Sequence, residues 1–150
     1  MLTVSDTKTP ETDTSGALIR KLLLEAGHEV IGSTIVRDEP KDVQRVIREA
    51  CASDAVKVVI ATGGTGITSR DSTYEAIDAM LDKRLPGFDE LFRMLSYQEI
   101  GAAAMLSRAQ LGIHARRIVV SLPGSPNACR LALEKLIIPE LGHLLREIGR

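Results

Sequence analysis

A run of glycines follows a buried strand near the middle of the chain and ends in a carboxylate. Residues 58–71 read VVIATGGTGITSRD, with glycine at Gly63, Gly64 and Gly66 and a carboxylate at Asp71. Glycine permits positive φ and leaves no side chain in the way, so backbone N–H groups can gather around an anion. We interpret the segment as a phosphate-binding loop; an ordinary tight turn between strand and helix is the alternative. It matches neither GxxxxGK[ST] nor GxGxxG, so neither nucleotide fingerprint applies.

Two aspartates lie where strands of the predicted sheet end. Asp38 follows one strand and Asp71 closes the glycine loop after another. A carboxylate near bound phosphates is repelled unless a cation lies between them, so the pair suggests Mg²⁺ held by Asp38, Asp71 and substrate oxygens. The alternatives are structural: Asp38 as a turn residue or helix cap before Glu39 and Pro40, and Asp71 as the N-cap of the next helix.

A second candidate anion site follows the last predicted strand. Ser125 is a good N-cap, Pro126 suits the first helical position, and Pro123-Gly124 makes the preceding turn sharp. Free N–H groups at that helix start would attract an anion. A plain capped helix explains the same residues.

The elements that must position these residues alternate between strand and helix. Strands are expected at 2–5, 30–36, 56–61, 110–114 and 117–122, the last two joined by a turn. Helices are expected at 15–26, 40–52, 72–81, 88–95 after a Pro86-Gly87 break, and 125–148 with a bend at Pro139. This order predicts an α/β fold: a single domain, residues 1–150, with a mostly parallel sheet between two helical layers. Ligands of such sheets bind beyond the carboxyl ends of the strands.

Composition and charge exclude several classes of partner. The formal net charge is −1 and the 150 residues include no tryptophan, two tyrosines and two phenylalanines, so we expect no nucleic-acid partner. The first residues show neither a basic region nor a long apolar run, which predicts no signal peptide, no membrane span and a cytoplasmic location. Cys51 and Cys129 sit in helical patterns and are expected to be small buried residues in a reducing compartment.

Several motifs together resemble the MoaB/MogA family of molybdenum-cofactor biosynthesis proteins, across essentially the whole chain. They are Thr62-Gly63-Gly64-Thr65-Gly66 with Arg70-Asp71, Thr3-Val4-Ser5-Asp6 with Thr14-Ser15-Gly16, Val36-Arg37-Asp38-Glu39, Pro86-Gly87-Phe88, Leu106-Ser107-Arg108 and Leu122-Pro123-Gly124-Ser125-Pro126. Residues 92–101, FRMLSYQEIG, are more similar to the MoaB branch than to the MogA branch.

The resemblance implies a molybdopterin-binding domain that adenylylates molybdopterin with MgATP and releases pyrophosphate. The product then receives molybdate, or tungstate in some organisms, which implies a molybdenum-insertion protein as a partner. Asp38 and Asp71 match the catalytic aspartates of the family. Its pterin- and phosphate-binding positions match Ser5, Asp6, Thr62, Gly63, Gly64, Thr65, Gly66, Arg70, Ser107, Pro123, Gly124, Ser125 and Pro126.

Elementary chemistry agrees with that reaction. The nucleophile is a phosphate monoester, already largely anionic at neutral pH, so little base catalysis is needed. The barrier lies in bringing anions together in line, and Mg²⁺ with backbone dipoles lowers it. We therefore assign Asp38 and Asp71 to metal binding and orientation. Two other functions stay open: a pterin-binding carrier without catalysis, and a related nucleotide-hydrolysing enzyme.

The family forms trimers, and its MoaB branch often forms hexamers. In this sequence Phe88, Leu91, Phe92 and Leu95 repeat at helical spacing after the Pro86-Gly87 break, so this face is expected to pack on a neighbouring chain. We expect a trimer-based homo-oligomer, a hexamer before a trimer; a monomer with these residues in its own core is the alternative.

Overall fold

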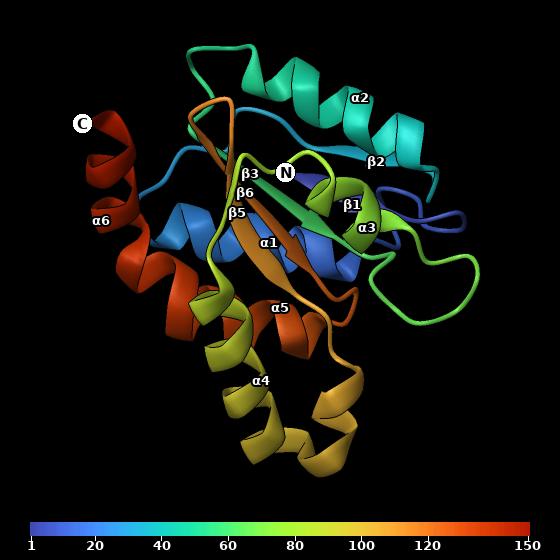
Figure 1. The fold of residues 1–150 in the computed structure, drawn as a ribbon. Coiled ribbons are helices and arrows are strands. Elements are labelled where there is room, and N and C mark those ends of the chain that lie inside the picture. Colours follow the sequence, from blue (N-terminus) through green and yellow to red (C-terminus); the bar gives the residue numbers. More distant parts are fainter.

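A six-stranded sheet forms the centre of the molecule. The structure is a computed structural model that describes residues 1–150, and its strand order is β2-β1-β3-β6-β5-β4 (Figure 1). The strands are β1 (Leu2–Val4), β2 (Thr34–Val36), β3 (Val58–Thr62), β4 (Lys83–Arg84), β5 (Gln110–His114) and β6 (Arg117–Leu122). The first three and β6 pair in parallel, whereas β5 runs antiparallel to β6 and β4 antiparallel to β5. The predicted, mostly parallel sheet is confirmed.

Helices cover both faces of this sheet and complete the predicted three layers. They are α1 (Thr14–Glu25), α2 (Pro40–Cys51), α3 (Thr73–Asp78), α4 (Pro86–Ile100), the 3₁₀ helix η1 (Gly101–Leu106), α5 (Pro126–Ala132), the π-helical turn η2 (Leu133–Ile137) and α6 (Ile138–Gly149). One core joins the sheet to α1, α4, α5, η2 and α6; the other joins it to α2 and α3. Both cores contain residues of β3 and β6, which are therefore buried on both faces, as expected for central strands.

Two strands differ from the prediction. The strand expected at 30–36 begins only at Thr34, the residue that pairs with Leu2 at the start of β1. Lys83 and Arg84, where no strand was expected, form the short edge strand β4, and both residues remain exposed. Charged residues on an edge strand discourage pairing with other chains.

The long C-terminal helix changes its hydrogen-bonding pattern where a bend was predicted. The π-helical turn Leu133–Ile137 lies between α5 and α6, and Pro139 follows in the first turn of α6. Proline has no N–H to donate to the preceding turn, which accounts for a disturbed helix at this point. None of the helices is both long and apolar enough to cross a membrane.

The expectation that one face of α4 contacts a neighbouring chain is wrong in part. Phe88 and Phe92 are 8% and 0% exposed and belong to the protein's own core, whereas Leu91 is 49% exposed. The helix begins at Pro86, so the Pro-Gly pair starts it instead of separating it from the core. In Figure 1, α4 and the 3₁₀ helix extend beyond the sheet, away from α2.

Candidate active site

Five segments that are far apart in the sequence meet at one edge of the sheet. The carboxyl ends of β1, β2, β3 and β6 share this edge because these strands are parallel. The amino end of β5 joins them, because β5 runs the other way. Residues that follow four strands and precede a fifth can therefore act together.

A cavity of about 350 Å³ opens at this edge and collects most of the predicted phosphate-binding residues. It is lined by Gly63, Gly64, Thr65, Gly66, Asp71, Leu106, Ser107, Arg108, Pro123 and Gly124. A larger cavity of about 610 Å³ lies at the opposite end of the sheet, but its lining is mainly apolar and includes none of the predicted site residues. The smaller cavity is the one with convergent polar groups, and we take it as the functional site.

The glycines of the loop are required by its backbone path. Gly63 and Gly64 have φ values of +98° and +66°. A Cβ on Gly63 would collide with the carbonyl oxygen of Val4, and one on Gly64 with the side chains of Thr73 and Asp38. At these two positions the loop therefore passes too close to its neighbours for any other residue.

The peptide groups of this loop are fixed by their carbonyl oxygens. Thr73 N–H donates to Gly64 O at 2.9 Å, and Arg108 donates to the carbonyl oxygens of Thr65 (2.8 Å) and Gly66 (2.5 Å). The backbone amides of Gly64, Thr65 and Ile67 have no acceptor within the protein. Consecutive free amides of this kind form an anion-binding concavity.

Asp38 is buried beside this loop, 6% exposed, and anchors the start of α3. Its Oδ1 accepts hydrogen bonds from Ser72 N (3.2 Å), Ser72 Oγ (2.8 Å) and Thr73 Oγ1 (3.2 Å). Its backbone N–H donates to Asp6 Oδ1 at 3.2 Å. Oδ2 receives none of these bonds and lies against Gly64. A cap of its own helix is excluded, because Glu39 is the N-cap of α2.

Asp71 closes its own turn and is ionised. Its Oδ2 accepts from Thr68 N at 3.0 Å and Thr68 Oγ1 at 2.6 Å. The hydroxyl of Thr68, helped by the N–H groups of Thr68 and Gly66 and by the charge of Arg108, lowers the carboxyl pKa below its ordinary value, although partial burial opposes this. The alternative role as N-cap of the next helix is wrong, because Ser72 occupies that position.

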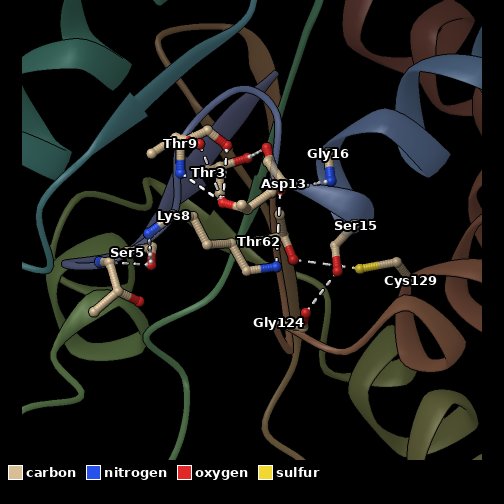
Figure 2. Close-up of polar contacts among 12 residues, drawn as sticks. Thr3, Ser5, Lys8, Thr9, Asp13, Ser15, Gly16, Thr62, Gly124 and Cys129 are labelled. Atoms are coloured by element: carbon tan, nitrogen blue, oxygen red, sulfur yellow. Dashed lines mark hydrogen bonds and ion pairs between the residues drawn. The ribbon is translucent and has the colours of Figure 1, made fainter.

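The opposite wall of the cavity is held in a similar way (Figure 2). Thr62 Oγ1 donates to Pro123 O at 2.9 Å, and Ser15 Oγ donates to Gly124 O at 2.7 Å. The thiol of Cys129 also donates to Pro123 O, at 3.3 Å, and burial raises the pKa of that thiol, so it stays neutral. Both cysteines are free and buried, as predicted. Thr62 is thus a support beneath the cavity.

The first turn of α1 is fixed by Asp13, which the sequence analysis did not single out. Asp13 is 3% exposed; its carboxylate accepts from Thr3 Oγ1 at 2.6 Å and caps the helix through Gly16 N at 2.9 Å. Figure 2 shows this group next to Ser15. A buried cap of this kind fixes Ser15 and, through it, the loop at Gly124.

Two predicted site residues at the end of β1 have partners within the protein. The Ser5 hydroxyl accepts from the backbone of Thr7 and Lys8. Asp6 forms an ion pair with Arg70 at 2.8 Å, and Arg70 also contacts Glu39 at 2.8 Å. The Arg70 guanidinium lowers the pKa of Asp6, and the two carboxylates raise the pKa of Arg70. These residues join three strand ends outside the cavity lining.

Ser125 and Pro126 begin α5, as predicted. Ser125 Oγ accepts from Ala128 N at 3.2 Å, and Pro126 takes the first helical position. Neither lines the cavity, whereas Pro123 and Gly124 do. The capped helix is therefore present, and the preceding turn supplies the contact with the cavity.

Arg108 and Leu106 line the cavity but were not among the predicted site residues. Arg108 sits two positions before β5, and its side chain is 26% exposed. A signal was present: only two residues, Ala115 and Arg116, separate β5 from β6. So short a connection requires antiparallel pairing, which returns the start of β5, with Ser107 and Arg108, to the edge where β6 ends.

The site offers limited metal ligands of its own. No group of three or more His, Cys, Asp or Glu side chains in the structure is arranged to hold a metal ion. Asp38 Oδ2 lies against Gly64 and Asp71 Oδ2 against Gly66, so the two carboxylates flank the free amides of one loop. Asp71 lines the cavity and Asp38 does not. Carboxylates are ligands of the kind that Mg²⁺ takes, one or two at a time, with phosphate oxygens and water completing its shell.

Comparison with known proteins shows the family to which the chain belongs. A family model described as "Probable molybdopterin binding domain" matches residues 1–143. The chain belongs to this family. Molybdenum cofactor biosynthesis protein B of Bacillus cereus is 52% identical over 151 residues, covering 100% of this chain and 89% of the relative.

Solved structures of family members have the same fold. A crystal structure of a molybdenum cofactor biosynthesis protein B superposes with a TM-score of 0.97 at 53% identity, covering 99% of this chain and 93% of that one. The tungsten cofactor synthesizing protein MoaB from Pyrococcus furiosus gives a TM-score of 0.88 at 42% identity, covering 99% and 94%. The resemblance to the MoaB/MogA family is confirmed, and molybdenum cofactor biosynthesis is the function that this family indicates.

Proposed function

We propose that this protein joins molybdopterin to AMP, with ATP as the adenylyl donor. The terminal phosphate oxygen of the pterin forms a bond to the α-phosphorus of ATP, the bond from that phosphorus to the oxygen bridging to the β-phosphorus breaks, and pyrophosphate leaves. The observation that carries the proposal is the glycine loop, where free amides of Gly64 and Thr65 lie between two carboxylates, Asp38 and Asp71.

The charges of the site explain why the reaction needs both the free amides and the two carboxylates. The amides stabilise phosphate oxygens, but Asp38 and Asp71 repel them at the same place. Mg²⁺ bound by these carboxylates and by the phosphates of ATP would remove the repulsion and stabilise the charge of the transition state. The protein's own residues bind and orient: the glycine loop and the turn at Pro123-Gly124 hold phosphates from two sides.

The decisive experiment incubates the protein with molybdopterin and MgATP and follows adenylated pterin and pyrophosphate together. We expect equal amounts of both. Pterin binding without either product would support a carrier instead. Release of pyrophosphate and AMP that does not depend on pterin would support a nucleotide pyrophosphatase.

We also propose that the protein works as a trimer-based homo-oligomer, a hexamer before a trimer. Its partners would be other proteins of the same synthesis, which supply the pterin and take up the product, including one that inserts the metal. Nine large hydrophobic residues are highly exposed, and six of them are Leu91, Met94, Tyr97, Ile100, Met105 and Leu106. Their concentration on α4 and the 3₁₀ helix is typical of a protein interface.

A further inference from the structure

Arg108, which lines the cavity, connects the glycine loop to α3. Its Nε donates to Thr65 O at 2.8 Å and its Nη2 to Gly66 O at 2.5 Å. Its Nη1 pairs with Glu75, and its guanidinium lies 4.8 Å from the centre of the Tyr74 ring. All three guanidinium nitrogens therefore have acceptors within the protein, and one face of the group is covered by an aromatic ring.

We propose that Arg108 is a positioning residue, which fixes the Thr65–Gly66 and Gly66–Ile67 peptide groups of the glycine loop and, through the Gly66 N–H, the carboxylate of Asp71, and does not bind the phosphate itself. The proposal builds on the function proposed above. It assigns to Arg108 a role separate from that of a charged ligand, which is the usual expectation for an arginine in a phosphate site.

Peptide planarity supplies the first argument. A carbonyl and the N–H of the following residue belong to one rigid plane and point in opposite directions. By holding the carbonyl oxygens of Thr65 and Gly66, Arg108 directs the N–H groups of Gly66 and Ile67 away from itself. The Gly66 N–H then faces the carboxylate of Asp71, and that of Ile67 has no acceptor in the protein.

The second argument is the cost of the alternative. A bidentate contact with a phosphate needs two N–H groups on one edge of the guanidinium, and both such edges already bind the two backbone carbonyls or the carboxylate of Glu75. Losing one of these partners removes a hydrogen bond that holds the loop in place. The loop would also lose the bonds that orient its own amides, so the gain at one contact would weaken several others.

The test compares Arg108→Lys and Arg108→Gln with the matched control Arg84→Gln. Lysine keeps the charge but cannot hold two carbonyls in a planar fork; glutamine removes the charge as well. Arg84, on β4, donates to Asp78 of α3, the helix that also carries Glu75, and it has no contact with the loop. Two quantities are measured without ATP or pterin: amide order parameters of residues 64–67 by NMR, and the affinity for inorganic pyrophosphate by titration calorimetry.

We expect both Arg108 variants to lower the order parameters from a rigid value of about 0.85 to below about 0.6. Pyrophosphate affinity should fall about tenfold in both, and the control should match the parent protein. Full affinity in Arg108→Lys with loss only in Arg108→Gln would show that charge alone matters and would overturn the proposal, as would unchanged order parameters.

Glu75→Ala gives a second test, which applies even where the Arg108 variants fail to fold. If Arg108 positions the loop, removing Glu75 loosens Arg108 and lowers the order parameters of residues 64–67. Unchanged order parameters in Glu75→Ala would refute the proposal. Because these measurements need no turnover, they stay informative even where the proposed adenylyl transfer is absent.

Discussion

Among single residues, the proposed reaction depends most on the charge of Asp71. Asp71→Asn keeps the size of the side chain and an oxygen that can accept from Thr68, but removes the charge available to Mg²⁺. We expect adenylyl transfer to fall on the order of a hundredfold or more, as when a key electrostatic group is lost, with the fold intact. Asp54→Asn, a fully exposed carboxylate, is the control. Near-normal turnover of Asp71→Asn would refute the metal assignment.

The low pKa of Asp71 should depend on its hydrogen bond from Thr68. Thr68→Val removes the hydroxyl that contributes most to the lowering, so we expect the Asp71 pKa to rise toward the ordinary carboxyl value. The sign follows for stability: the bond stabilises the fold above the ordinary carboxyl pKa and is lost as pH falls through the lower value of the folded state. A carbon-13 titration of the Asp71 carboxyl measures this directly, and an unchanged curve would contradict it.

At the scale of the elements, the glycine loop has no room for a side chain. Gly64→Val would place a branched Cβ against Thr73 and Asp38 and penalise the positive φ. We expect the affinities for pterin phosphate and for ATP to fall together. Gly87→Val is a suitable control because a Cβ there meets nothing within 4 Å. Unchanged calorimetric affinities in a folded Gly64→Val protein would reduce the loop to a simple turn.

The hairpin between β5 and β6 carries strain that can be relieved. Its two turn residues, Ala115 and Arg116, both have positive φ, 48° and 61°. Two-residue hairpins of this kind favour Asn-Gly, because left-handed backbone costs other residues about 1 kcal/mol each. We expect Arg116→Gly to stabilise the protein by roughly 0.5–1 kcal/mol in urea unfolding at fixed protein concentration. A loss of stability would show that the arginine side chain contributes more than the strain.

The elements also show how far the sequence alone can lead. Strand and helix types follow from local patterns, and the carboxyl ends of parallel strands locate Asp38, Asp71 and the glycine loop. The partners of Asp38 could not be predicted, because Ser72 and Thr73 reach it only when the fold brings the start of α3 to the loop that follows β2. The role of Arg108 likewise depends on the direction of β5, and that of Phe92 on which side of α4 meets the sheet.

At the scale of the whole molecule, the exposed face of α4 should decide the assembly. Met94 is 52% exposed and lies among the apolar residues of this face. We expect light scattering to give the mass of six or three 16.2 kDa chains, and Met94→Glu to give that of one, because a charge in an apolar interface stays unpaired. Leu24→Glu, at an exposed position of α1, is the control. A single-chain mass for the parent protein would refute the assembly.

β6 lies between β3 and β5 although it is the last strand in the sequence. Until residues 117–122 have been synthesised, β3 keeps an unpaired apolar edge, and the glycine loop has no opposite wall. Pairing of strands so distant in sequence is slow, and open strand edges favour aggregation meanwhile. A nascent chain that ends before Arg117 therefore carries the glycine loop but no binding site, and depends on rapid completion of synthesis or on chaperones to stay free of other chains.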